Sequence, residues 1–259
     1  MRSFWTHSAE AAGRLARGRL LVTLDFDGTL AALAETPDQA RLEPEYRAAL
    51  KALCASPGVG LFILSGRALR PLRRLVGLRG LYYGGNHGAE LAGPGLAWRD
   101  DKALAARREL ADLAADLRER FPAGTGVLVE DKQFSVSVHY RNIRPPYRRG
   151  FLARMGRLTC RRGPLRWKRG HKVFEALPAG AAHKGDALAL LARRLRAASC
   201  LAVGDDLTDE DMFRAVGRGG IAVRVGCRAG SAADYFLRSQ GEVLRLLEFV
   251  AAVRRGRGR

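Results

Sequence analysis

Three apolar, strand-like runs of this chain each end in a cluster of polar residues, and this arrangement constrains the fold more than any other feature. The runs lie at residues 20–24, 59–64 and 200–203, with helix-like segments between them. Alternation of strands and helices predicts a parallel, doubly wound α/β sheet. Because ligands bind beyond the carboxyl ends of the strands in such a sheet, the polar clusters are predicted to face one cleft.

The first polar cluster places two carboxylates where a strand ends. Asp25 and Asp27 stand two residues apart, and Gly28 and Thr29 allow the chain to turn tightly behind them. An isolated pair of this kind is commonly a polar turn whose acids face water. Here other polar clusters are expected beside it, and the pair instead indicates a site that processes an anion.

The other two strand ends carry complementary chemistry. Ser65 and Arg67 supply a hydroxyl and a guanidinium after the second run, and residues 205–211 supply five acids after the third. Each feature alone has a structural explanation: the first could be an ordinary strand-to-helix turn. The second could be a helix start, where acids complement the helix dipole.

A lysine stands at the start of a predicted helix. Lys184 precedes the apolar-periodic segment 187–195. A cation is unfavourable at a helix N-terminus unless an anion such as phosphate is bound nearby. The alternative is a solvated side chain.

Taken in this order, the features resemble the haloacid dehalogenase superfamily of phosphotransferases, in which a nucleophilic Asp-x-Asp precedes a Ser or Thr, a Lys and an acidic metal-binding loop. More narrowly, the chain resembles the trehalose-6-phosphate phosphatase family over roughly residues 20–248. The narrower resemblance rests on segments 25–30 (DFDGTL), 64–67 (LSGR), 85–90 (GNHGAE), 129–132 (VEDK), 138–141 (VHYR), 184–185 (KG) and 204–210 (GDDLTDE).

The resemblance implies a mechanism. Asp25 would attack phosphorus and form an aspartyl-phosphate, and Asp27 would protonate the leaving sugar oxygen and then activate water. Ser65 and Lys184 would hold the phosphoryl oxygens. The expected cofactor is Mg²⁺, which prefers hard oxygen ligands. Its predicted ligands are Asp25, the carbonyl of Asp27, Asp205 and Asp206.

The chain also contains a predicted insertion, because the character of the sequence changes from about residue 92. Residues 1–19, 38–54 and 68–76 predict the helices of the first part. The insertion is predicted to hold helices at residues 103–120 and 146–157, strands at 126–130 and 134–140, and a second strand pair at 165–177. We therefore expect a Rossmann-like haloacid dehalogenase core of residues 1–91 and 178–259, interrupted by a smaller α/β cap domain of residues 92–177.

A cap would limit water at the site and recognise the sugar. Exposed charges on hairpins are also commonly just solvated, and His87 could equally be a core or hinge residue. The predicted substrate-binding residues are Arg67, Asn86, His87 and Glu90 at the core edge, and Glu130, Lys132, Arg141, Lys172 and Glu175 in the cap.

The chain is strongly basic, with 45 Lys and Arg against 26 Asp and Glu and a formal net charge of +19. Such a charge usually indicates a nucleic-acid or anionic-surface partner. Arginine supplies 39 of the cations and is spread along a chain rich in Ala and Gly, as nucleotide-composition bias would produce. Clusters lie only at 141–149, 161–172 and 254–259. We expect no specific nucleic-acid partner, while non-specific polyanion binding at low salt stays open.

Hydropathy and cysteine spacing indicate the cellular location of the protein. No apolar run approaches the twenty residues of a membrane span, and the first residues contain no apolar signal segment. We therefore expect no membrane partner and a cytoplasmic location. The four cysteines lie far apart without a CxxC spacing, which indicates buried free thiols in place of a zinc site or disulfides. A monomer is expected.

The predicted function is Mg²⁺-dependent hydrolysis of trehalose 6-phosphate, a small-molecule sugar phosphate, in trehalose biosynthesis. Three departures from the family pattern weaken the choice of sugar. Residues 175–178 read Glu-Ala-Leu-Pro where Glu-x-Arg-Pro is common, His183 precedes Lys184 where Asn or Ser is frequent, and Cys227 stands where a threonine or similar small residue is common. The alternatives are a phosphatase of sucrose 6-phosphate or mannosylglycerate phosphate, or a basic nucleic-acid-binding module. A degenerate scaffold is disfavoured because every chemically required residue is present.

Overall fold

The computed structural model describes residues 1–34, 39–122, 124–160, 163–170 and 172–256. It divides into two compact units: Met1–Trp98 with Ala182–Arg259, termed the core unit, and Arg99–Ala181, termed the cap unit. The core unit continues beyond the predicted boundary at residue 91 because a strand hairpin extends its sheet. Parts of the predicted helix 38–54 and of the basic clusters 161–172 and 254–259 lie outside the described residues.

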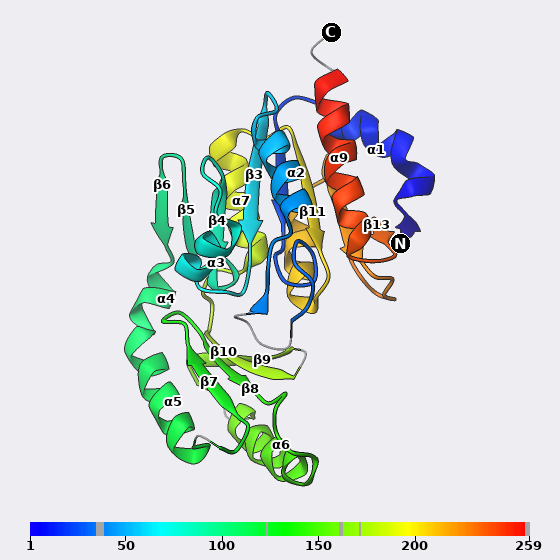
Figure 1. The fold of residues 1–259 in the computed structure, drawn as a ribbon. Coiled ribbons are helices and arrows are strands. Elements are labelled where there is room, and N and C mark those ends of the chain that lie inside the picture. The colour runs from blue at the N-terminus through cyan, green and yellow to red at the C-terminus, as the bar shows by residue number, and fades with distance from the viewer. Residues whose placement is uncertain (35–38, 123, 161–162, 171, 257–259) are drawn as a thin grey trace. The chain divides into compact units, whose positions relative to one another are not determined.

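Within the described residues, nine strands form one sheet in the order β1-β13-β12-β11-β2-β3-β4-β5-β6 (Figure 1). Every pair from β1 to β4 in this order is parallel, and β5 runs antiparallel to β4. This topology confirms the predicted doubly wound α/β core. The strands are β1 (Arg2–Ser3), β2 (Leu20–Leu24), β3 (Val59–Leu64), β4 (Tyr82–Gly85), β5 (Glu90–Gly93), β6 (Leu96–Arg99), β11 (Ser199–Gly204), β12 (Ile221–Val225) and β13 (Tyr235–Leu237).

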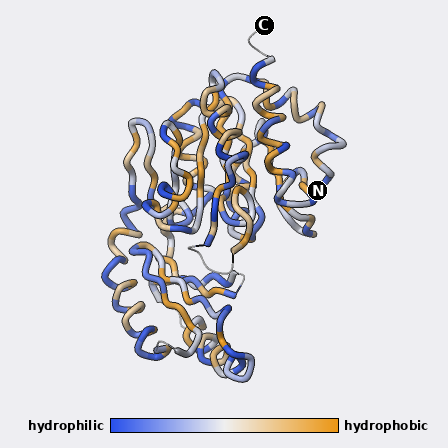
Figure 2. The backbone as a smooth tube through the Cα atoms, viewed as in Figure 1, coloured by the Kyte–Doolittle hydropathy of each residue, from blue (hydrophilic) through white to orange (hydrophobic). Residues whose placement is uncertain are grey.

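Helices cover both faces of this sheet, and the strand side chains alternate between them. Along β2, Leu20, Val22 and Leu24 pack into one apolar cluster and Leu21 into another. The first cluster draws on α1 (Ser8–Leu15), α2 (Pro44–Cys54), α3 (Leu69–Val76) and α9 (Gly241–Arg255), and the second on α7 (Lys184–Leu195) and α8 (Glu210–Ala215). With both faces covered, β2 is buried throughout. Figure 2 shows the strands as the apolar centre of the core unit.

The predicted core helices are present with shifted bounds. The helix predicted at 1–19 is shorter, because residues 2–3 pair with β13 and Trp5–His7 form a 3-10 turn before α1. α2 begins at Pro44, whose fixed φ suits the first helical position. α7 begins at Lys184, as predicted.

The cap unit is a four-stranded antiparallel sheet in the order β7-β8-β10-β9 with helices on one face. Its strands are β7 (Leu128–Asp131), β8 (Val136–His139), β9 (Leu165–Gly170) and β10 (Val173–Pro178). α5 (Arg107–Arg120) and α6 (Pro145–Thr159) pack on Val136, Val138 and Phe174. The helix predicted at 103–120 is divided at Ala106 into α4 (Asp101–Ala105) and α5.

No helix among the described residues is long and apolar enough to cross a membrane. The four cysteines are free thiols, but the prediction that they are buried is wrong for two of them. Cys200 is buried in β11, whereas Cys160 at the end of α6 and Cys227 in the loop after β12 are exposed.

Candidate active site

A buried lysine joins two acids of the core unit. The Lys184 ammonium donates to Asp25 Oδ1 and to Asp209 Oδ1, each at 2.6 Å. Lys184 and Asp209 are 2 % and 0 % exposed, so these ion pairs form away from water. The pairing explains the lysine at a helix start, because its charge is neutralised by acids from two neighbouring strand ends.

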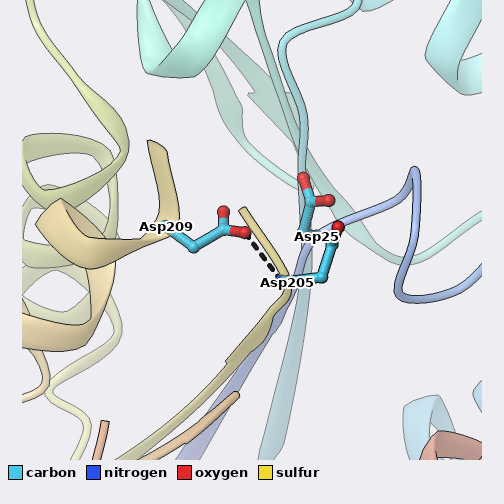
Figure 3. A group of neighbouring side chains, drawn as sticks. All are labelled: Asp25, Asp205 and Asp209. Carbon is cyan, nitrogen blue, oxygen red and sulfur yellow. Dashed lines mark hydrogen bonds between the residues drawn. The ribbon is translucent and has the colours of Figure 1, made fainter. Parts of the chain in front are cut away.

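Asp25 lies directly after β2 and Asp205 directly after β11, and these two strands are adjacent in the sheet. One oxygen from each of Asp25, Asp205 and Asp209 lies within 4.8 Å of the others. Figure 3 shows the three side chains next to one another, with the hydrogen bond from the Asp205 amide to Asp209 dashed. Asp205 is held there by Thr29, whose hydroxyl donates to Asp205 Oδ1 at 3.1 Å.

Three carboxylates share one ammonium in this cluster. Burial lowers the pKa of Lys184, but the charges of Asp209 and Asp25 outweigh this effect and raise it above its usual value. Burial raises the pKa of the Asp25 carboxyl well above its usual range; Lys184 opposes the rise, and Asp209 and Asp205 add to it. Burial, reinforced by Asp209, raises the pKa of Asp205 to about 7.

The donor set fits a divalent cation. With Lys184 protonated, ionisation of all three acids leaves two negative charges in excess, and a hard divalent ion with oxygen ligands would neutralise them. Both Asp209 oxygens already accept hydrogen bonds: Oδ1 from Lys184, and Oδ2 from the amides of Asp205 and Asp206 at 2.9 Å each. Asp25 and Asp205 are therefore better placed as ligands than Asp209.

The acidic loop after β11 is held in place by its own Asp206, a predicted metal ligand, and by Arg224, which was not among the predicted site residues. The Asp206 carboxylate accepts from the amide of Leu207 at 2.7 Å and caps a 3-10 turn, so it is engaged in the loop itself. Arg224, on β12 and 6 % exposed, donates to the carbonyls of Asp205 and Asp206 and to Glu210 Oε1. An arginine inside the apolar strand IAVRV was the available signal for this contact.

A glycine lets the first motif approach the acidic loop. Gly28 has a φ of +84°, a conformation in which a side chain is strained, and a Cβ there would lie 2.3 Å from Asp205 Oδ2. The glycine of the Asp-x-Asp-Gly pattern is therefore required sterically, since only glycine leaves room for the carboxylate.

The second acid of the first motif is paired with the guanidinium of the second motif. Arg67 donates through Nε to Asp27 Oδ2 at 2.7 Å and through Nη2 to Asp27 Oδ1 at 2.6 Å. The backbone amide of Arg67 also donates to Ser65 Oγ at 3.1 Å. The three residues follow β2 and β3, which are paired in parallel.

The residues predicted at the core edge, Asn86, His87 and Glu90, hydrogen-bond to the turn that carries Ser65 and Arg67 or to the start of α3. The amide of Asn86 donates to the carbonyl of Arg67 at 2.7 Å, and that of His87 to the carbonyl of Ser65 at 3.0 Å. Glu90 Oε1 accepts from the Asn86 side chain and from the amide of Leu69, both at 2.8 Å. All three residues are buried, and Asn86 and His87 have positive φ values of 48° and 58°.

Three of the predicted cap residues lie on or beside the polar face of the cap sheet. Glu175 Oε1 accepts from Lys132 Nζ and Ser135 Oγ at 3.1 Å and from Ser137 Oγ at 3.2 Å. Glu130 Oε2 pairs with His139 Nε2 at 3.1 Å. Burial raises the pKa of Glu130, but the His139 hydrogen bond and the Lys132 charge outweigh it and lower the pKa.

The remaining predicted cap residues occupy the loops next to these strands. Arg141 is partly exposed after β8, and Lys172 lies before β10 with a φ of 56°. The carbonyl of Lys172 accepts from the amide of Tyr140 at 3.0 Å.

Comparison with known proteins identifies the family. A family model described as trehalose-phosphatase matches residues 23–240. The chain belongs to the trehalose-phosphatase family. It is 41 % identical over 213 residues to a trehalose-phosphate phosphatase of Mycobacterium marinum, covering 80 % of this chain and 54 % of that one. The corresponding Mycobacterium tuberculosis protein is 39 % identical over 210 residues, covering 79 % and 53 %. The chain thus spans about half the length of these curated relatives.

Solved structures of trehalose-6-phosphate phosphatases share the fold. The C-terminal domain of Candida albicans trehalose-6-phosphate phosphatase aligns with a TM-score of 0.78 at 21 % identity, covering 94 % of this chain and 96 % of that one. Aspergillus fumigatus trehalose-6-phosphate phosphatase aligns with a TM-score of 0.63 at 25 % identity, covering 94 % and 97 %.

Proposed function

We propose that this protein is a Mg²⁺-dependent phosphatase that hydrolyses trehalose 6-phosphate through an aspartyl-phosphate on Asp25. The observation that carries the proposal is the cluster of three carboxylates around Lys184, beside an acid, Asp27, that is held by Arg67. Family membership favours this function over a basic nucleic-acid-binding module. The names of the relatives support trehalose 6-phosphate as the substrate.

In the proposed first step, a carboxylate oxygen of Asp25 attacks phosphorus. The bond from phosphorus to the sugar oxygen breaks, and Asp27 gives that oxygen a proton. In the second step Asp27 takes a proton from water, which attacks the phosphoryl group and releases phosphate with Asp25 restored. Lys184 orients Asp25 through Oδ1 and, with the Ser65 hydroxyl, would hold phosphoryl oxygens.

Asp25 and Asp205, with the Asp27 carbonyl, would hold Mg²⁺, and Asp206 lies next to them. Bound Mg²⁺ would offset the charge of the carboxylates and of the substrate phosphate. Asp209 would act indirectly, because its carboxylate positions Lys184 and the backbone amides of the acidic loop.

The Arg67 contact controls when Asp27 can act. Both Asp27 oxygens accept from Arg67, so Asp27 must release at least one of these hydrogen bonds before it can carry the transferred proton. A substrate phosphate offers Arg67 another bidentate acceptor. Arrival of the phosphate would therefore free Asp27 to take up a proton from solvent and pass it to the leaving sugar oxygen.

For the sugar, we propose that Glu130, Lys132, Arg141, Lys172 and Glu175 supply hydroxyl contacts from the cap unit. Asn86, His87 and Glu90 would act mainly by supporting the turn that carries Ser65 and Arg67. We further propose a monomeric, cytoplasmic enzyme, which light scattering and cell fractionation test.

The decisive experiment is phosphate release from trehalose 6-phosphate, sucrose 6-phosphate, mannosylglycerate phosphate and other sugar phosphates, with Mg²⁺ and with chelator. We expect selective, metal-dependent release from trehalose 6-phosphate that Asp25→Asn abolishes. Asp211→Asn is the matched control, because it removes a nearby acid, in the first turn of α8, that pairs with Arg214 at the protein surface. Equal turnover of several sugar phosphates would contradict the substrate, and release that survives in Asp25→Asn would contradict the mechanism.

A further inference from the structure

A groove in the cap unit lies outside the site described above. It has a volume of about 580 Å³ and runs along α6, the segment before β7 and the loop that leads into α6. This volume is within the range of small-molecule sites in proteins. Its floor is apolar and includes Phe121, Ile143 and Phe151, which belong to the core of the cap unit.

The groove is on the helix side of the cap sheet. Phe151 packs with Val136, Val138 and Phe174, whose side chains point to one face. Ser137 and Glu175 alternate with these residues along β8 and β10 and therefore point to the other face. The groove is thus separate from the polar face that carries the proposed sugar contacts.

The rim of the groove combines one aromatic ring with two cations. Tyr147 and Arg154, on α6, line it from positions seven residues apart, which fall on the same side of a helix. Gly150 lies between them and leaves the groove open. Arg144, just before the helix, supplies the second guanidinium. Tyr147 is 67 % exposed, the highest fraction among the exposed large hydrophobic side chains of the described residues, so its ring is accessible to a ligand in the groove.

All the charged residues in the sequence segment that forms most of the groove are positive. Residues 141–172 contain 12 Lys and Arg and no Asp or Glu, and none of the residues that line the groove is acidic. Among the described residues, no hydrogen bond or ion pair engages the guanidinium of Arg144 or Arg154. Two uncommitted guanidinium groups beside an exposed ring complement a ligand that has both an anionic group and a flat, apolar group.

We propose that this groove binds a nucleoside phosphate, with its base stacked on Tyr147 and its phosphates held by Arg144 and Arg154. Aromatic side chains stack on any base, and arginine binds phosphate through paired hydrogen bonds. A sugar phosphate lacks the flat group, and inorganic phosphate would leave Tyr147 and the apolar floor uncovered. This site is independent of the phosphatase function proposed above.

Calorimetric titration of the full chain with ADP in the presence of chelator tests the proposal, because chelator suppresses turnover. We expect saturable binding of one ADP per chain. Tyr147→Ala and Arg154→Gln should each weaken it at least tenfold, while Arg149→Gln, an exposed arginine of the same helix outside the groove, should change it less than twofold. Since Tyr147 and Arg154 are exposed, both variants should keep the wild-type melting temperature.

Binding at the active site is distinguished by Asp25→Asn and Ser65→Ala, which should leave the ADP affinity unchanged. Adenosine and inorganic phosphate should each bind at least tenfold more weakly than ADP. The proposal is overturned if ADP does not bind, if Arg149→Gln weakens binding as much as Arg154→Gln, or if affinity follows the active-site variants. Phosphate binding as tight as that of ADP would contradict the nucleoside assignment.

Discussion

Replacing Gly28 by alanine should disable the site while leaving most of the fold intact. The new Cβ would lie 2.3 Å from Asp205 Oδ2 and 2.5 Å from its Cγ, whereas ordinary contacts exceed 3.4 Å. The Asp205 carboxylate must therefore move by about 1 Å, a displacement that typically costs about 100-fold in turnover when it affects a catalytic group. Its hydrogen bond from Thr29 would be lost as well.

A positive φ itself destabilises a residue other than glycine, by about 1–2 kcal/mol. Gly217→Ala provides the matched control for this effect, because Gly217 has a φ of +73° and a Cβ added there would have no atom within 4 Å. Both variants should lose similar stability from the backbone. Only Gly28→Ala should also lose turnover, through the position of Asp205.

The assays are phosphate release at saturating Mg²⁺ and thermal unfolding with and without Mg²⁺. We expect Gly28→Ala to fall about 100-fold in turnover and to lose most of the Mg²⁺-induced rise in melting temperature. Gly217→Ala should keep both. The reasoning is refuted if Gly28→Ala stays within threefold of Gly217→Ala in turnover and retains the same response to Mg²⁺.

Three further predictions concern other contacts. Arg67→Lys removes the paired hydrogen bonds to Asp27 and should lower kcat at least tenfold and change the pH profile of kcat. An unchanged pH profile would show that Arg67 does not control the protonation of Asp27. Arg254→Met should lower the free energy of unfolding by about 3 kcal/mol, measured by denaturant titration, because buried Arg254 donates to the carbonyls of Leu15, Ala16, Gly18 and Pro57. In chelator, the free energy of unfolding should fall as pH rises from about 4 to about 7, because the native state holds the Asp205 proton more tightly than the unfolded chain. Asp205→Asn should make this pH dependence weaker. Saturating Mg²⁺ in place of chelator should remove most of it.

The sequence was sufficient to predict which strand ends meet. Asp25, Ser65 and Asp205 follow β2, β3 and β11, which are neighbours in the sheet, and parallel strands bring their carboxyl ends to one edge whatever the connecting segments contain. Lys184 at the start of α7 was likewise predictable from helical periodicity. These features depend on local pattern and on a general rule of topology.

The partners of individual side chains were not predictable in the same way. The pairing of Arg224 with the carbonyls of the acidic loop spans 18 and 19 residues and depends on which face of β12 meets that loop. The position of Asp209 between Lys184 and two amides depends on a 3-10 turn that no sequence pattern distinguished from a helix start. The compact core unit reaches Trp98, beyond the expected boundary at residue 91, because β6 pairs into the core sheet, and the change in sequence character does not indicate that pairing.

The local charge of the site and the total charge of the chain have opposite signs, and the difference implies an order of binding. A net charge of +19 attracts phosphate esters toward the protein from a distance. At the site, however, Asp27 is paired with Arg67, while Asp25, Asp205 and Asp209 share a single cation among the described residues, Lys184, so the fully ionised cluster repels a phosphate dianion. Either protons or a divalent ion must first compensate the cluster, and at neutral pH only the ion leaves Asp25 ionised for the proposed attack on phosphorus. The metal should therefore enter before the substrate.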